Sequence, residues 1–356
     1  MIPHRKYLEM ALKLAEKGRH TVSPNPMVGS LVVKRGKIIG RGFHVRAGED
    51  HAEVIALKQA GKRAKNSTLY VTLEPCSHWG RTPPCTEAIV KSGVSEVVIG
   101  MKDPNPLVNG FGILKSRGIK TRMGVLEEEA RRMNEIYIKY IKTKKPFVIL
   151  KVAASLDGKI ATSTGNSKYI TSKESRKYVH QLRSNVDAVL IGINTLIADN
   201  PKLDARLVKG KDPIKIIVDS TLKIPLKGNI MKSPEKLIIA TTSKAPKNKI
   251  KAIQNKGAKI IIAPSKAGLV DLDFLMRELG KHEITSILIE GGNRVNSSAL
   301  KEKIVDKILV FTAPRLIGKG LDAFGDLGIK KLDNTINIRE MSTRKIGNDI
   351  LVEGYL

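Results

Sequence analysis

Two short stretches set the interpretation of the first half of this chain: HAEVIAL, residues 51–57, and EPCSHWGRTPPC, residues 74–85. The chain has only two cysteines, Cys76 and Cys85, and both lie in the second stretch. The charged N-terminal segment predicts an amphipathic helix rather than an export signal, so a metal site is favoured over a disulfide. His51 supplies a third ligand of a type that zinc prefers. We therefore predict a zinc site at His51, Cys76 and Cys85.

Three protein ligands leave one tetrahedral position open, as in catalytic zinc sites. Glu53 lies two residues after His51, and both would flank the start of a helix for which Asp50 is a candidate N-cap. Zinc lowers the pKa of a bound water to about 7, and a carboxylate beside it can move the protons of a hydrolytic deamination. Glu53 is thus the candidate catalytic residue. The alternative is a closed structural site with His78 as the fourth ligand.

The length of 356 residues predicts two domains, with a boundary where a charged segment meets an apolar run near Pro146. We place the domains at residues 1–144 and 145–356. The first begins with a helix and a hairpin over residues 29–44, then alternates strands with helices, which indicates a three-layer α/β domain. In it, residues 124–144 predict one long helix.

In the second part, seven Val- and Ile-rich runs alternate with helical patterns, which is typical of a mainly parallel sheet covered on both faces. The predicted strands begin near residues 147, 188, 214, 237, 258, 286 and 306. The strand before Gly291 and Gly292 leads into a helix, and the amides at such a helix start can bind phosphate. The pattern is not that of a dinucleotide-binding Rossmann motif.

The formal net charge of +29 invites a nucleic-acid interpretation. Against it, the lysines form no long run, and aromatic residues, which single-strand binders use for stacking, make up only 4% of the chain. A solvated lysine coat with some phosphate-binding positions is favoured. No apolar run is long enough to cross a bilayer, so we expect no membrane partner and a cytoplasmic location.

Four segments of the first part carry a family resemblance: residues 51–57, 72–85, 23–29 and 102–110. In the second part, the same order continues through KVAASLDGKIA, SKYITS, INTLIADNPKLDARL, IVDS and LIEGGNRVNSSAL. Together these segments resemble the bifunctional deaminase/reductase family of riboflavin biosynthesis, over nearly the whole chain. The resemblance implies an α/β fold with an N-terminal cytidine-deaminase-like domain and a C-terminal dihydrofolate-reductase-like domain.

For the first domain, the resemblance implies zinc-dependent hydrolytic deamination of 2,5-diamino-6-(ribosylamino)-4(3H)-pyrimidinone 5′-phosphate. The eight residues between the two cysteines, where many zinc deaminases have two, would form a substrate loop. Residues that the resemblance places near this substrate are Asn25, His44, His78 and Arg81. Without it, the two loop residues would be exposed side chains and His44 a packed histidine at a strand end.

For the second domain, the resemblance implies NADPH-dependent reduction of the ribosyl group to a ribityl chain. Lys151, Asp199 and Glu290 would be the catalytic residues around the ribose. The substrate contacts would be Ser167, Arg183, Leu203 and Arg206. The cofactor contacts would be Ala153, Tyr169, Thr195, Ser220, Gly292, Asn293, Arg294, Val295, Asn296, Ser297 and Ser298. Tyr169 stands where many relatives have Trp.

The expected cofactors are therefore Zn2+ and NADPH, and the expected partners are phosphorylated pyrimidines and further copies of the chain. Two alternatives share the zinc site. A nucleic-acid deaminase of the tRNA adenosine type would use the positive charge, but it needs no reductase-like domain. A zinc-stabilised binding protein would leave Glu53 without a role.

Overall fold

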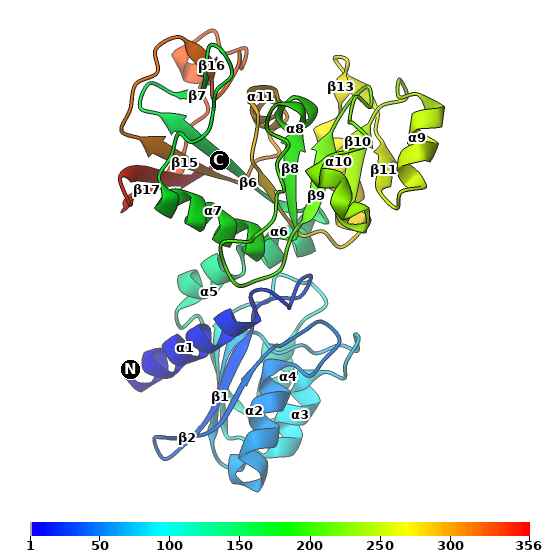
Figure 1. The fold of residues 1–356 in the computed structure, drawn as a ribbon. Helices are drawn as coiled ribbons and strands as arrows, with labels where there is room; N and C mark the ends of the chain where they lie inside the picture. The colour runs from blue at the N-terminus through cyan, green and yellow to red at the C-terminus, as the bar shows by residue number, and fades with distance from the viewer. Residues whose placement is uncertain (1) are drawn as a thin grey trace. The chain divides into compact units, whose positions relative to one another are not determined.

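The computed structural model describes residues 2–356, with side chains described from His4 onward. It divides into two compact units, Met1–Lys144 and Lys145–Leu356. The first runs from blue to cyan in Figure 1 and the second from cyan-green to red. Each unit has its own buried apolar core, built from Val, Ile, Leu and Ala side chains of its sheet and helices.

The first unit is built on a five-stranded mixed sheet. The predicted hairpin is present as two antiparallel strands, and the last three strands of the sheet run parallel to one another. In spatial order the strands are β2 (Lys37–Phe43), β1 (Gly29–Lys34), β3 (Thr68–Leu73), β4 (Glu96–Met101) and β5 (Lys120–Met123). Because β3 and β4 are parallel, the residues that follow them emerge at the same edge of the sheet.

Helices pack closely against this sheet from its two faces (Figure 1). On one face, a Cβ atom added to Gly29 would lie 2.0 Å from the carbonyl oxygen of Ala11 in α1. On the other face, a Cβ atom added to Gly42 would lie 2.1 Å from the carbonyl oxygen of Ala52 in α2. The absent side chains therefore let both helix backbones touch the strands. The helices are α1 (Ile2–Ala15), α2 (Ala52–Ala60), α3 (Cys85–Ser92) and α4 (Gly110–Ser116). The predicted three-layer arrangement is confirmed.

The long helix predicted for residues 124–144 is instead two helices, α5 (Glu127–Met133) and α6 (Glu135–Thr143). They are separated by Asn134, which is buried. Its amide side chain accepts a hydrogen bond from the backbone N–H of Met27 (2.8 Å) and donates one to the Met27 carbonyl (3.0 Å). This pair of bonds fixes Asn134 against the segment before β1, and periodicity alone does not reveal it.

The second unit is built on a nine-stranded sheet in which seven neighbouring strands are parallel. The strands predicted from the Val- and Ile-rich runs are all present, and every neighbouring pair among them is parallel. In spatial order they are β11 (Lys259–Ile262), β10 (Leu237–Thr241), β9 (Ile214–Val218), β8 (Ala188–Gly192), β14 (Ser286–Ile289), β6 (Phe147–Ser155) and β15 (Lys307–Ala313).

The sheet is completed by an antiparallel hairpin, β18 (Asp349–Tyr355) and β17 (Arg339–Ile346), which was not predicted. Nearly every residue of β17 is exposed, so it lacks the apolar alternation by which strands are found. Asp349, which is buried, ties the hairpin to the start of α7, because its carboxylate accepts hydrogen bonds from Ser172 and Ser175.

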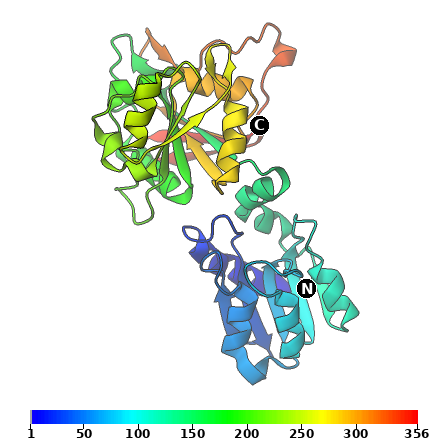
Figure 2. The ribbon, with the colours of Figure 1, turned by 90° about the vertical axis from the view of Figure 1, so that its right-hand side faces the viewer.

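Helices cover both faces of this sheet (Figure 2). They are α7 (Lys173–Asn185), α8 (Ile193–Asp199), α9 (Lys247–Gln254), α10 (Leu272–Lys281) and α11 (Asn293–Lys301). Two small ribbons are formed by β7 (Lys159–Thr162) with β16 (Gly320–Asp322), and by β12 (Ser265–Lys266) with β13 (Leu269–Val270). Within residues 2–356, no helix has the length and apolar character needed to span a bilayer.

Candidate metal centre and reductase site

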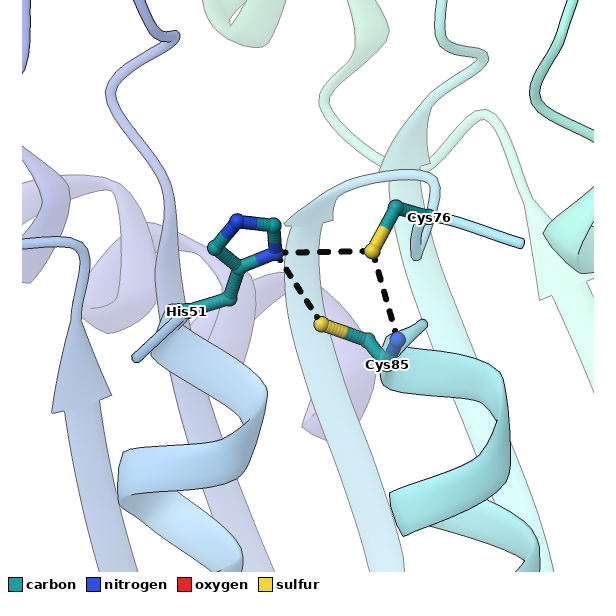
Figure 3. Close-up of side chains that lie close together, drawn as sticks. All are labelled: His51, Cys76 and Cys85. Carbon is teal, nitrogen blue, oxygen red and sulfur yellow. Dashed lines mark hydrogen bonds between the residues drawn. The ribbon is translucent and has the colours of Figure 1, made fainter. Parts of the chain in front are cut away.

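The three predicted zinc ligands come together at the ends of three elements of the first unit (Figure 3). His51 is the N-cap residue of α2, Cys76 lies in the loop after β3, and Cys85 is the first residue of α3. The ligand atoms of the three residues lie within 4.8 Å of one another. His51 and Cys85 lie 34 residues apart in sequence, so the fold brings the three ligands together.

The donor atoms point at one another. His51 Nδ1 lies 3.2 Å from the Sγ of Cys85 and 3.4 Å from the Sγ of Cys76, and the backbone N–H of Cys85 donates to Cys76 Sγ (3.2 Å). One imidazole nitrogen and two sulfurs form the donor set of three-ligand zinc sites. His78 does not join this cluster among the residues described. The geometry thus favours the open site over the closed alternative.

The two thiols differ in their protonation. Hydrogen bonds from Cys85 and from the His51 imidazole hold the pKa of Cys76 below its ordinary value. The pKa of Cys85 is raised, because its thiol donates to Cys76 and because it is buried. Cys85 also lies at the N-terminus of α3, where the helix dipole favours a thiolate. A divalent cation at this point would hold both sulfurs as thiolates.

Glu53 is 3% exposed and lies in the first turn of α2. Burial raises its pKa to about 7, although the neighbouring His51 acts in the opposite direction. A carboxyl group with a pKa near neutrality can both take and give a proton there. The expected N-cap role of Asp50 is wrong: His51 is the N-cap, and the carboxylate of Asp50 pairs with Lys58 at 2.5 Å.

Asn25 and His44 form a connected pair near the ligands. The Nδ1–H of the buried His44 donates to the carbonyl of Asp50 (3.2 Å), so its Nε2 accepts from the amide nitrogen of Asn25 at 3.0 Å. Burial lowers the pKa of His44, which keeps the ring neutral for this arrangement. Because the amide nitrogen of Asn25 is used by His44, its Oδ1 remains as an acceptor for an N–H group of a ligand.

The loop between the two cysteines carries a contact that sequence reasoning missed. The hydroxyl of Thr82 lies 3.3 Å from Nε2 of His51. Trp79, the only tryptophan of the chain, is 70% exposed in the same loop, and Arg81 is exposed as well. The Nδ1 atom of His78 is buried and has no hydrogen-bond partner in the structure. Nothing in the local sequence marks Thr82 except its place between the two ligands.

A second missed group supports the strand end that leads to Cys76. The buried Glu74 accepts hydrogen bonds from the backbone N–H groups of Phe111 (2.9 Å) and Asp103 (3.2 Å). Asp103 in turn accepts from the hydroxyl of Tyr137 at 3.0 Å, and its burial raises its pKa to about 6. This network joins the loops after β3 and β4 and fixes the start of the segment that bears the zinc ligand.

In the second unit, three of the predicted site residues form one buried charged cluster. Arg183 of α7 binds Glu290 with two hydrogen bonds, Nε to Oε1 at 2.5 Å and Nη2 to Oε2 at 2.9 Å. Burial raises the pKa of Glu290, but the charges of Arg183 and Lys151 outweigh that effect and leave it below its ordinary value. Burial also lowers the pKa of Lys151, which eases the release of its proton.

A second group joins Asp199, at the end of α8, to the segment before α7. Its carboxylate accepts from the hydroxyl of Ser167 (3.3 Å), and its backbone carbonyl accepts from Lys168 Nζ (3.2 Å). Arg206 forms an ion pair with Asp204, whose carbonyl binds Arg183. Leu203 is buried with a positive φ of 53°. Of the predicted substrate residues, Arg183 and Arg206 thus share Asp204 as a partner, and Ser167 contacts Asp199.

The segment from Gly292 onward, predicted to contact the cofactor, forms the start of α11. Gly292 is the N-cap of α11, and a Cβ added there would lie 2.8 Å from the hydroxyl of Thr195. Any larger residue at this position would therefore crowd Thr195. Backbone N–H groups at the start of a helix are a usual binding site for phosphate. The side chains of Asn293, Asn296 and Ser297 instead bond to residues 322–325. Cofactor binding by this segment would therefore come from its backbone amides.

The remaining predicted cofactor residues have mixed surroundings. Tyr169 is 63% exposed and stacks under the guanidinium of Arg176 at 4.1 Å. The hydroxyl of Ser220 accepts a hydrogen bond from the N–H of Val270 (3.2 Å), so it already serves the fold. Ala153 lies in β6, Arg294 is exposed in the first turn of α11, and Val295 and Ser298 follow in that helix.

Taken together, the fold and the His-x-Glu, Cys, Cys centre define a zinc deaminase domain of the cytidine-deaminase type, followed by a dihydrofolate-reductase-like domain. Two family models match the chain. The cytidine and deoxycytidylate deaminase zinc-binding region covers residues 1–101, and the RibD C-terminal domain covers residues 146–352. The chain belongs to the RibD family of riboflavin biosynthesis proteins.

Similar proteins cover almost the whole chain. The riboflavin biosynthesis protein RibD of Aquifex aeolicus is 45% identical over 98% of this chain and 97% of its own, and that of Escherichia coli is 38% identical over 97% of each. Among solved structures, RibD of Acinetobacter baumannii has a TM-score of 0.89 at 35% identity, covering 99% of this chain and 98% of its own.

A deaminase/reductase structure from Thermotoga maritima is also similar, with a TM-score of 0.88 at 37% identity over 99% of this chain and 98% of its own. That protein is named as a diaminohydroxyphosphoribosylaminopyrimidine deaminase and 5-amino-6-(5-phosphoribosylamino)uracil reductase. The nucleic-acid deaminase alternative is not favoured, since these relatives include the second domain and are named for riboflavin synthesis.

Proposed function

We propose that this chain catalyses two consecutive steps of riboflavin biosynthesis. The first unit deaminates 2,5-diamino-6-(ribosylamino)-4(3H)-pyrimidinone 5′-phosphate, and the second reduces the ribosyl group of the product with NADPH. The observation that carries the proposal is the convergence of His51, Cys76 and Cys85 beside the buried Glu53, in a chain whose family model continues through residue 352. The high positive charge suits substrates and a cofactor that all bear phosphates.

In the deaminase unit, His51, Cys76 and Cys85 would hold zinc, which supplies a water acidified toward neutral pH. The carboxyl group of Glu53 takes a proton from the attacking water and returns it to the leaving amino group. Its pKa of about 7 suits both transfers. Asn25 presents its amide oxygen to a ring N–H, held in place by His44. Arg81 and His78, in the loop between the cysteines, contribute phosphate and ring contacts.

In the reductase unit, NADPH supplies the hydride, and the amides at the start of α11 would hold its diphosphate. The sugar ring must open before its anomeric carbon can accept a hydride. The candidates for the proton transfers of ring opening are Lys151, whose pKa is lowered by burial, and Asp199, whose carboxylate accepts a hydrogen bond from Ser167. Glu290 and Arg183 hold Lys151 in a charged and buried setting.

A paired assay on the purified protein tests both assignments. We expect ammonia release from the diaminopyrimidine phosphate and, after NADPH is added, NADPH oxidation. A zinc chelator should stop ammonia release, but when it is added after the deaminated intermediate has formed it should leave NADPH oxidation unchanged, because no zinc ligand is assigned to the second unit. Ammonia release without NADPH oxidation would contradict the reductase assignment, and chelator-insensitive ammonia release would contradict the zinc assignment.

Asp199→Asn separates the two steps. The amide cannot accept the proton that the carboxylate can, so NADPH oxidation should fall by about 10²–10⁴-fold while ammonia release stays at the wild-type rate. Single-turnover NADPH oxidation on the deaminated intermediate is the measurement. Asp333→Asn, which changes an exposed carboxylate of the same unit, is the control. Wild-type NADPH oxidation by the Asp199 variant would remove Asp199 from the mechanism.

The cellular setting of the protein belongs to the same proposal. We expect a cytoplasmic enzyme that self-associates and acts on small phosphorylated pyrimidines rather than on nucleic acid or membranes. The exposed strand β17 lies at the edge of the second unit's sheet, and its unpaired backbone groups offer a place where another copy can add a strand. Sedimentation of the purified protein gives its oligomeric state.

A further inference from the structure

We propose that Thr82 is a positioning residue of the metal centre: its hydroxyl accepts a hydrogen bond from Nε2–H of His51 and so directs Nδ1 of that ring toward the metal. This inference rests on the proposed zinc site at His51, Cys76 and Cys85. It assigns a role to a loop residue that neither the zinc-binding pattern nor the predicted substrate contacts include.

The two ring nitrogens of His51 face different partners. Nδ1 lies 3.2 and 3.4 Å from the two cysteine sulfurs, whereas Nε2 lies 3.3 Å from the hydroxyl of Thr82. A histidine that ligates a metal through Nδ1 uses the neutral ring with its proton on Nε2. Nε2 is then a donor, and the hydroxyl oxygen of Thr82 is the acceptor in line for it.

The ring of His51 needs such a partner because its side chain makes no hydrogen bond to the start of α2. His51 is the N-cap of α2, in extended conformation, and makes no side-chain capping bond. On one side the ring meets the edge of His44, with the ring centroids 5.1 Å apart. This ring contact does not select the direction of the two ring nitrogens, whereas a hydrogen bond is directional. The bond to Thr82 supplies that direction.

The position of Thr82 is in turn tied to a zinc ligand. Pro83 and Pro84 connect it to Cys85, and their rings restrict the backbone between the two residues. The carbonyl of Thr82 also accepts from the N–H of Gly80 at 3.2 Å. The eight residues between the cysteines therefore do more than lengthen the loop. They bring a hydroxyl from the segment before Cys85 onto the far side of the His51 ring.

The test compares zinc affinity in matched variants by competition with a chromophoric chelator. Thr82→Val keeps the shape of the side chain and removes the hydroxyl, whereas Thr82→Ser keeps the hydroxyl and removes the methyl group. Loss of a partner of this kind weakens metal binding by about 10–100-fold. We expect that loss in Thr82→Val and near wild-type affinity in Thr82→Ser. Thr82→Ala repeats the hydroxyl deletion without adding apolar surface.

A second readout uses Trp79, the only tryptophan, which lies three residues before Thr82. Zinc titration of the wild type should change its fluorescence at the same concentration at which the chelator loses zinc, and Thr82→Val should shift that midpoint. Equal zinc affinity in wild type and Thr82→Val, or equal losses in the Val and Ser variants, would overturn the role of the hydroxyl. A wild-type protein that binds no zinc would instead overturn the proposed metal centre.

Discussion

Glu53→Gln should lower the rate of ammonia release by about 10²–10⁴-fold, the usual contribution of a general acid–base group. Gln has the size of Glu but cannot take the proton of the attacking water. The wild-type carboxyl group is 3% exposed and has a pKa of about 7, so both its protonated and its ionised form are populated near neutral pH. The amide removes that capacity and keeps the packing.

Zinc should remain bound in the Glu53 variant, since Glu53 is not among the three ligands. The measurements are ammonia release at saturating substrate and zinc content by atomic absorption. Glu49→Gln, which makes the same change at an exposed position just before α2, is the matched control and should be fully active. Ammonia release at the wild-type rate with zinc bound would mean that another group carries the protons.

The metal centre was open to prediction because its chemistry is concentrated in sequence. Both cysteines of the chain lie in one stretch of twelve residues, and His51 and Glu53 start a helix whose end is marked by Gly61. The parallel strands were equally visible, since buried strands such as β8 are continuous apolar runs. In both cases short segments of characteristic composition carry the signal.

What could not be predicted depends on contacts between distant segments. The break at Asn134 is set by its bonds to Met27, more than one hundred residues away in sequence. Strand β17 of the C-terminal hairpin is exposed along nearly its whole length and has no apolar face to reveal it. Thr82 gains its meaning only when the fold brings its hydroxyl to His51. Polar side chains whose partners are distant in sequence do not produce a periodic pattern from which they could be predicted.

The reductase residues mark a different limit. Arg183 on a helix and Glu290 after a strand would each be read as ordinary surface or turn residues without the family pattern. The structure instead buries them as a bidentate pair, with side-chain exposures of 13% and 8%. A buried ion pair costs desolvation energy, and breaking it by removing one partner is severe because the other charge stays buried. This makes the pair the most sensitive point of the second unit.

Glu290→Gln should therefore destabilise the second unit by about 3–5 kcal/mol, because Arg183 and the nearby Lys151 lose their buried counter-charge. For a unit of this size, that corresponds to a fall in its unfolding midpoint of about 6–20 °C. Burial raises the pKa of Glu290, but the neighbouring cations lower it by more. The ion pair therefore stabilises the folded unit at neutral pH. This contribution to stability is lost as the pH falls through the lowered pKa. Calorimetry at pH 7 is the measurement.

A double variant separates stability from chemistry. Arg183→Leu combined with Glu290→Leu replaces the pair by apolar side chains, which often restores stability, so its midpoint should lie above that of Glu290→Gln. NADPH oxidation should stay lost in both, since the charged surroundings of Lys151 are gone. Glu235→Gln, an exposed change in the same unit, should match the wild type in both measurements. A Glu290→Gln protein with the wild-type midpoint would show that the Arg183 charge is compensated by other groups.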